Sequence, residues 1–282
     1  KQKTAYEISL GLVGSEMCIR DSNNTNAVGI EQRNAYISDW ETRSEIVNNI
    51  WRPRCNIPYG SRPRQRLDVF SCGTAEAPTL LYIHGGYWQM GDKESYGFIG
   101  DSALASGYNF VLVEYTLAPE VRMDEIVSEI HEAIDWVIAN IDEYGGDPRR
   151  VFISGHSAGG HLTAMGMSDQ RVAGGIAISG LFDLEPIRLN YLNQKLGLDE
   201  AEMLRNSPMN NIPSEPSPLV VTVGLGELPE LIRQSEDYYN AWQCRGHPGQ
   251  YLPIPERDHF SVLEELAKPD GLILAALDDL AS

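Results

Sequence analysis

Seven short apolar runs, separated by segments of helical character, constrain the fold more than any other feature of this sequence. The runs occupy residues 66–72, 79–85, 109–115, 150–155, 174–180, 218–224 and 250–255. Strands that alternate with helices are typical of a mostly parallel sheet with helices on both faces. Several runs are apolar on both faces, as buried parallel strands should be. The sequence therefore predicts an α/β fold.

Four segments predict helices, and one long segment interrupts the alternation. Residues 121–144 carry apolar side chains at three- and four-residue steps, and 95–107, 234–246 and 271–281 are further expected helices, the first of them short. Residues 182–217 are too long for an ordinary crossover and contain several prolines. We expect them to form a small helical cap excursion between the fifth and sixth strands, close to a ligand site.

The N-terminal segment differs from the rest of the chain. Residues 1–22 show no helical or strand periodicity of any length, and the polar run "NNTN" joins them to the remainder of the chain. Within them, "LVGSEMCIRDS" resembles a translated sequencing linker. We therefore expect residues 1–22 to be a non-native or disordered segment and residues 23–282 to form a single domain.

The net charge and the composition of the chain exclude some classes of binding partner. The chain carries 22 Lys and Arg against 40 Asp and Glu, and this net charge of −18 opposes binding to phosphate backbones and anionic membranes. No apolar run reaches the ~20 residues that span a bilayer. The four cysteines lack metal-ligand spacing and are typical of reduced thiols. We expect a cytoplasmic protein with a small-molecule ligand and no nucleic-acid or membrane partner; a homodimer is compatible with the sequence.

The stretch "VFISGHSAGGHL" contains a G-x-S-x-G match, Gly155 to Gly159, between an expected strand and a helical pattern. In that context the serine occupies a tight strand-to-helix turn, and its hydroxyl projects at the end of the sheet beside the positive end of a helix. We predict that Ser157 is a nucleophile. The alternative interpretation is a glycine-rich turn with an incidental serine.

A serine hydroxyl needs a base to take its proton, and the chain has six histidines. His259 follows the last expected strand in a loop before a helix, where the base is expected when the order is serine, acid, histidine. The acid should follow the penultimate strand, where "VVTVGLGELPEL" offers Glu227 and Glu230. Glu227 is closer to the strand end and is the stronger candidate. Asp258 is a weaker alternative, because neighbouring side chains in a loop rarely face each other.

The stretch "YIHGGYWQMG" leaves the second expected strand through two glycines. Hydrolysis at a carbonyl develops a negative oxygen, which backbone N–H groups aimed at it can stabilise. One donor would be the Ala158 amide, which follows the nucleophile. Gly85 and Gly86 can turn further amides inward without a Cβ in the way. We predict an oxyanion hole formed by Gly85, Gly86 and Ala158; a simple Gly-Gly turn is the alternative.

These motifs resemble the α/β-hydrolase superfamily over about residues 50–281. Within it, His-Gly-Gly-Tyr-Trp at 84–88 resembles the H-G-G-x-W signature of kynurenine formamidases (arylformamidases), whereas hormone-sensitive-lipase-like esterases carry a third glycine where Tyr87 stands. The segments "YGSRPRQRLDVF", "GHSAGGHLTAM", "SGLFDLEPI", "RNSP" and "RQSEDYY" resemble the formamidases as well. The segment "YTLAPE" also resembles the esterase branch.

The resemblance implies an α/β-hydrolase fold, a mostly parallel central sheet flanked by helices, and a triad at Ser157, Glu227 and His259. The glutamate is a departure, since the family's acid is more often aspartate. The implied reaction is hydrolysis of N-formyl-L-kynurenine to L-kynurenine and formate through a formyl-serine intermediate, without metal or organic cofactor. Tyr87 and Trp88 would border the acyl site; in the other interpretation Trp88 packs under the loop and holds its shape. The alternatives are a carboxylesterase acting on short-acyl or aryl esters and a non-catalytic receptor or binding module.

Overall fold

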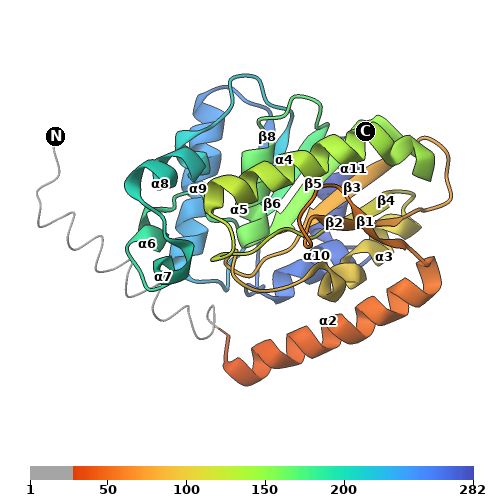
Figure 1. The fold of residues 1–282 in the computed structure, drawn as a ribbon, viewed down its shortest axis with the longest axis horizontal. Helices are drawn as coiled ribbons and strands as arrows, with labels where there is room; N and C mark the ends of the chain where they lie inside the picture. Colours follow the sequence, from red (N-terminus) through yellow and green to blue (C-terminus); the bar gives the residue numbers. More distant parts are fainter. Residues whose placement is uncertain (1–27) are drawn as a thin grey trace, which may run out of the picture.

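Within residues 28–282, which the computed structural model describes, eight strands form one sheet (Figure 1). Across the sheet they are β1 (Arg54–Pro58), β2 (Arg66–Phe70), β4 (Asn109–Val113), β3 (Ala77–Ile83), β5 (Gly146–His156), β6 (Gly174–Ile178), β7 (Leu219–Gly224) and β8 (Gly249–Ile254). Among these strands β2 alone runs opposite to the other seven, so the β1–β2 and β2–β4 pairs are antiparallel and the remaining pairs are parallel. The seven expected strands and the α/β-hydrolase fold are confirmed. The prediction for residues 1–22 lies outside the described residues.

Helices cover both faces of the sheet, because successive side chains of each buried strand point to opposite sides. In β3, Leu81 and Ile83 belong to one apolar core, whereas Leu80 and Tyr82 belong to the other. The first core is covered by α4 (Met123–Asn140), α5 (Ala158–Gly166) and α9 (Pro229–Cys244). The second is covered by α2 (Ile30–Trp51), η1 (Lys93–Ile99), α3 (Gly100–Ala105), η4 (Ser261–Leu263), α10 (Glu264–Ala267) and α11 (Leu272–Ala281). A short turn, η2 (Ile141–Tyr144), follows α4.

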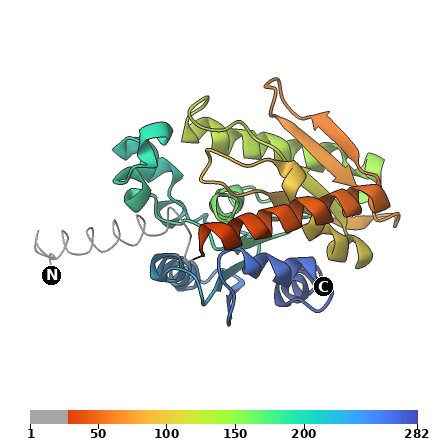
Figure 2. The ribbon, with the colours of Figure 1, turned by 90° about the horizontal axis from the view of Figure 1, so that it is seen from below.

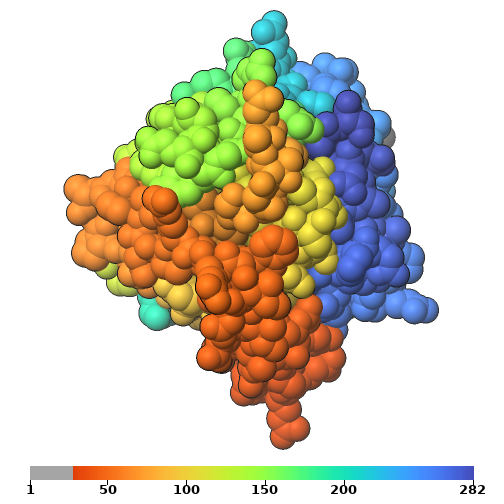
Figure 3. Space-filling view, turned by 90° about the vertical axis from the view of Figure 1, so that its right-hand side faces the viewer, coloured from red at the N-terminus to blue at the C-terminus, as the bar shows by residue number. Residues whose placement is uncertain are grey.

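Two elements, α2 and β1, were not predicted. The 22-residue helix α2 buries only Trp40, Ser44 and Val47, so its sequence shows no continuous apolar stripe. It crosses the outside of the molecule from near the cap excursion toward β1 and β2 (Figure 2). Figure 3 shows its red-orange surface beside the yellow surface around α3 and the blue C-terminal part. The strand β1 is mostly exposed and pairs with β2 at the edge of the sheet. An exposed edge strand does not need a run of apolar residues, so the sequence shows no signal for β1.

The long segment at 182–217 forms the expected helical excursion. It contains α6 (Glu185–Arg188), α7 (Asn193–Leu196), α8 (Glu200–Asn206) and η3 (Pro208–Asn210), coloured teal in Figure 1. Its buried Glu202 carboxylate accepts the backbone amide of Met123 at 3.1 Å and pairs with Arg122, at the start of α4. These contacts hold the excursion against the first turn of α4.

The parallel strands place their carboxyl ends at one edge of the sheet, where the loops that follow β3, β5, β7 and β8 meet. The loop after β3 begins at His84, and the turn after β5 holds Ser157. Glu227 follows β7, and His259 follows β8. The topology thus brings together segments that lie far apart along the chain.

Candidate active site

Ser157 lies in the turn between β5 and α5, with φ 59° and ψ −115°. A Cβ at Gly155 would lie 2.4 Å from the Gly159 carbonyl oxygen, and a Cβ at Gly159 would lie 2.0 Å from the Ile83 carbonyl oxygen. Both glycines are therefore needed for the turn to fit against β3. The Ser157 amide donates to the Ile178 carbonyl at 2.9 Å, which holds the strained residue in place.

Glu227 and His259 form a buried hydrogen-bonded pair. His259 Nδ1 lies 2.6 Å from Glu227 Oε2, and the histidine and the glutamate are 2 % and 5 % exposed respectively. The other carboxylate oxygen, Oε1, accepts the Ser179 hydroxyl at 2.5 Å and the Gly224 amide at 2.7 Å. Since the Glu227 carboxylate can only accept, Nδ1–H of His259 donates this hydrogen bond, and Nε2 of the neutral ring is left free to accept a proton. The ring is thereby oriented as a general base requires.

The two other candidate acids do not contact His259. Glu230 lies in the first turn of α9, where it pairs with Arg233 at 2.6 Å. Asp258 Oδ1 accepts the backbone amides of Phe260 at 2.9 Å and Ser261 at 2.8 Å, so it caps the turn after the histidine. Among the described residues, Glu227 is the carboxylate hydrogen-bonded to His259.

The glycine loop after β3 lies directly against the nucleophile. A Cβ at Gly85 would lie 3.2 Å from Ser157 Cβ and 2.8 Å from the His156 carbonyl oxygen. Gly86 has φ +119°, and its carbonyl accepts the amides of Gln89 at 3.0 Å and Met90 at 3.1 Å. This tight turn leaves the Gly86 amide without an acceptor among the described hydrogen bonds.

Gly85 and Ala158 are the two other predicted oxyanion donors. Ala158 is the first residue of α5, so its amide has no acceptor within the helix. The backbone hydrogen bonds of the described residues include none donated by the Gly85, Gly86 or Ala158 amide. The oxyanion hole formed by these three residues stays a prediction.

Trp88 holds the loop from beneath. The indole is 0 % exposed, and its Nε1–H donates to His161 Nδ1 at 3.2 Å. The two rings also meet edge to face, with centroids 5.0 Å apart. His161 Nε2 in turn lies 2.7 Å from the Asn206 carbonyl oxygen of the cap excursion. The buried indole presents no surface to a substrate, so it braces the loop, whereas the half-buried Tyr87 stays a candidate for substrate contact.

The chain is similar to known hydrolases in sequence and in fold. The family model BD-FAE matches residues 67–174. Kynurenine formamidase of Salmo salar is 35 % identical over 84 % of this chain and 84 % of its own, and that of Danio rerio is 31 % identical over 86 % and 87 %. A crystal structure of a Silicibacter protein provisionally described as a thioesterase is 30 % identical, with a TM-score of 0.81 over 92 % of this chain and 98 % of its own.

The chain belongs to the kynurenine formamidase family. It is a hydrolase of the formamidase or esterase type. Between residues 28 and 282 no helix is both long and apolar enough to cross a membrane. The same residues contain no group of three or more histidine, cysteine, aspartate or glutamate side chains placed to hold a metal ion.

Two further histidines, His156 and His161, are buried in this region. The His156 and His259 ring centroids are 4.4 Å apart. Burial and then the nearby His259 lower the pKa of His156 well below its ordinary value. Burial also lowers the pKa of His161 to about 4, although its hydrogen bond to Asn206 opposes this. At neutral pH both rings are therefore neutral.

Residues of α2, which sequence reasoning missed, support the loop that carries His259. The rings of Tyr36 and Phe260 stack with centroids 5.7 Å apart and an interplanar angle of 7°. Tyr36 Oη also donates to Asp258 Oδ2 at 3.3 Å, and Trp40 packs on Phe260 at 5.8 Å. Aromatic residues at positions 36 and 40, one helical turn apart, are the sequence signal that could have revealed this face of α2.

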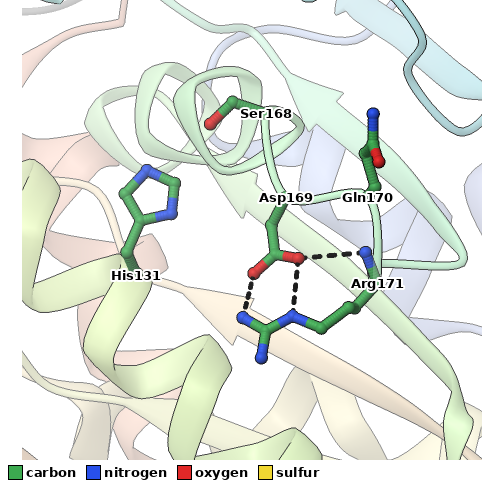
Figure 4. A pocket seen from close by; sticks show the side chains of 5 residues that line it. All are labelled: His131, Ser168, Asp169, Gln170 and Arg171. Atoms are coloured by element: carbon green, nitrogen blue, oxygen red, sulfur yellow. Dashed lines mark hydrogen bonds and ion pairs between the residues drawn. The ribbon is translucent and has the colours of Figure 1, made fainter.

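A surface hollow of about 480 Å³ is lined by His131, Ser168, Asp169, Gln170 and Arg171 (Figure 4). The helix α5 starts next to Ser157 and ends before the last four of these residues, so the hollow lies toward the opposite, amino edge of the sheet. Asp169 and Arg171 pair through two hydrogen bonds of 2.9 and 2.5 Å. The lining of the hollow includes none of the predicted residues Ser157, Glu227 and His259.

Proposed function

We propose that this protein hydrolyses aryl formamides, with N-formyl-L-kynurenine as the natural substrate and L-kynurenine and formate as products. The observation that carries the proposal is the buried Glu227–His259 pair at the same sheet edge as the strained Ser157 and the Gly86 turn. The relatives named kynurenine formamidase support the choice of substrate. The chemistry itself follows from the side chains.

In the proposed first half-reaction, the Ser157 hydroxyl attacks the formyl carbon while His259 Nε2 takes its proton. The Gly86 and Ala158 amides receive the developing oxyanion. His259 then passes the proton to the departing aryl amine, leaving a formyl-serine ester. In the second half, the same imidazole activates water, formate leaves and Ser157 is restored. Glu227 keeps the ring oriented and stabilises its cationic form in both halves.

The rim of the site offers apolar surface for an aryl group. Gln89 Nε2 donates to the Leu192 carbonyl at 3.0 Å and so joins the glycine loop to the cap excursion. The residues next to these two, Met90 and Tyr191, are 54 % and 44 % exposed. Exposed large apolar side chains are suited to contact an aromatic substrate. We therefore propose that the aryl ring packs on Met90 and Tyr191, where the loop and the cap excursion meet.

The kinetic test compares kcat/KM on N-formyl-L-kynurenine with that on p-nitrophenyl acetate. A higher value on the formamide is expected, and a much higher value on the ester would make the protein a carboxylesterase. Ser157→Ala provides the control for both assays. Labelling of the wild type, but not of Ser157→Ala, by a fluorophosphonate separates either enzyme from a non-catalytic binding module.

A further inference from the structure

A buried cluster of charges lies behind the glycine loop, and the triad does not use it. Glu114, which directly follows β4, is 0 % exposed. Its Oε1 accepts Arg64 Nη2 at 2.6 Å, and the same guanidinium nitrogen donates to the Gly91 carbonyl at 2.7 Å. Glu114 Oε1 also lies 3.1 Å from Nε2 of His84, the first residue of the loop. The cluster thus reaches the loop that faces Ser157.

Both ring nitrogens of His84 lie within hydrogen-bond distance of an oxygen acceptor. Its Nδ1 lies 2.7 Å from the Gly85 carbonyl oxygen, and its Nε2 faces the Glu114 carboxylate. A neutral imidazole has a single N–H and can donate to only one of these oxygens. The imidazolium satisfies both. Burial opposes ionisation of Glu114, but the hydrogen bond and charge of His84, together with the charge of Arg64, hold the pKa of this carboxyl below its ordinary value.

The surroundings hold the ring in one place. Tyr115 stacks on it with centroids 4.5 Å apart, and the Tyr115 hydroxyl donates to the His84 carbonyl at 3.0 Å. Gly91 lies next to the hydrogen bond between His84 Nδ1 and the Gly85 carbonyl oxygen. A Cβ at Gly91 would lie 3.0 Å from that oxygen and 3.2 Å from Nδ1. Gly91, with φ +95°, therefore leaves space for the hydrogen bond between His84 and Gly85.

The Gly85 carbonyl and the Gly86 N–H belong to the same peptide unit. We propose that His84, held by Glu114, is a positioning residue for the hydrolysis: it donates to the Gly85 carbonyl and thereby orients and polarises the Gly86 amide that receives the oxyanion. A donor on a carbonyl draws charge from the peptide and makes its N–H a stronger donor, as in other hydrogen-bond chains. The inference rests on the proposed function in one respect, the use of the Gly86 amide.

The test measures kcat and KM on p-nitrophenyl acetate for His84→Phe and His84→Asn. Phenylalanine keeps a ring but removes the donor, and kcat should fall about a hundredfold, close to the loss of one oxyanion donor. Asparagine can place its amide nitrogen near the position of Nδ1, so a fall of only about tenfold is expected. KM should not change in either variant. Affinity for an aryl trifluoromethyl ketone, which forms an anionic adduct with Ser157, should fall in proportion to kcat/KM.

A matched pair of carboxamide variants provides a second test that does not depend on the folding of His84→Phe. Glu114→Gln should lower kcat about fivefold. Glu129→Gln is the control, because Glu129 is similarly buried at 3 % exposure and accepts the Thr116 amide at 2.7 Å, but belongs to no part of the site. Its kcat should equal that of the wild type. Both variants should unfold at similar urea concentrations.

Equal kcat values for Glu114→Gln and Glu129→Gln would overturn the inference, as would a folded His84→Phe with wild-type kcat. A rise in KM alone, with the affinity for the ketone unchanged, would also contradict it. The ester assay requires the triad but not the formamide substrate. Failure on N-formyl-L-kynurenine with activity on the ester would therefore refute the proposed substrate and leave this test intact.

Discussion

Replacing Trp88 by phenylalanine distinguishes a brace from a substrate contact. The change removes the donor of the 3.2 Å bond and leaves the Nδ1 of His161, itself 0 % exposed, without a partner. An unpaired buried acceptor costs about 1–3 kcal/mol, and the void left by the smaller ring costs about 1 kcal/mol more. We expect the free energy of unfolding to fall by about 2–4 kcal/mol. A domain with a typical stability of about 5–15 kcal/mol remains folded after such a loss.

The kinetic consequence follows from the position of Trp88 under the glycine loop. Loosening the loop displaces the Gly86 amide, and a displacement of about 1 Å can cost about a hundredfold in rate. We expect kcat to fall about ten- to a hundredfold, by the same factor on N-formyl-L-kynurenine and on p-nitrophenyl acetate. Urea unfolding and steady-state kinetics on the two substrates measure the two effects.

Trp242→Phe is the matched control. Trp242 is also 0 % exposed and donates its Nε1–H to one carbonyl, that of Pro248 at 2.8 Å, but it lies near the start of β8, at the edge opposite the site. It should lose similar stability and keep its kcat. If Trp88→Phe kept its stability and raised KM on the formamide alone, the indole would be a substrate contact and the brace would be refuted.

Three further predictions concern the triad and its neighbours. Glu227→Gln should lower kcat by about a thousandfold or more, whereas Glu230→Gln, which disturbs only a partly exposed ion pair, should stay within about twofold; the reverse order would reassign the acid. Ser157→Ala and Ser157→Gly should both be inactive, and urea unfolding should find the glycine variant more stable by about 1–2 kcal/mol because φ is 59° at this position. The folded-state pKa of His161, about 4, lies below its ordinary value of 6.5, so its stabilising effect is complete above about pH 6.5 and is lost as the pH falls toward 4. This should amount to about 3 kcal/mol in urea unfolding across that range, and His161→Gln should flatten the dependence.

The strands of the sheet could be predicted because burial on both faces leaves continuous apolar runs in the sequence. The stretch 150–155, for example, corresponds to the middle of β5. The turn at Ser157 could be predicted for a local reason as well, since a Cβ on either flanking glycine would come within 2.0–2.4 Å of neighbouring backbone. By contrast, α2 was not predicted, because most of its length is exposed and its three buried residues, one of them a serine, mark only a narrow face.

The pairing of Glu227 with His259 could be anticipated from chain order alone, since the ends of adjacent parallel strands meet at one edge. The contact made by Trp88 could not, since it depends on His161, 73 residues away along the chain. Neither residue has a spacing or composition that marks this contact in advance.

The sequence by itself determined the order of strands along the chain, the strained serine turn and the candidate acid and base, because each is encoded by neighbouring residues or by the rule that parallel strands end together. Only the tertiary structure decided that Trp88 is buried against His161, and that Glu114 and Arg64 lie behind His84. Those properties depend on which side chains are buried against one another. Contacts between distant segments of the chain determine that burial, and they form only when the sheet and both helical layers are in place.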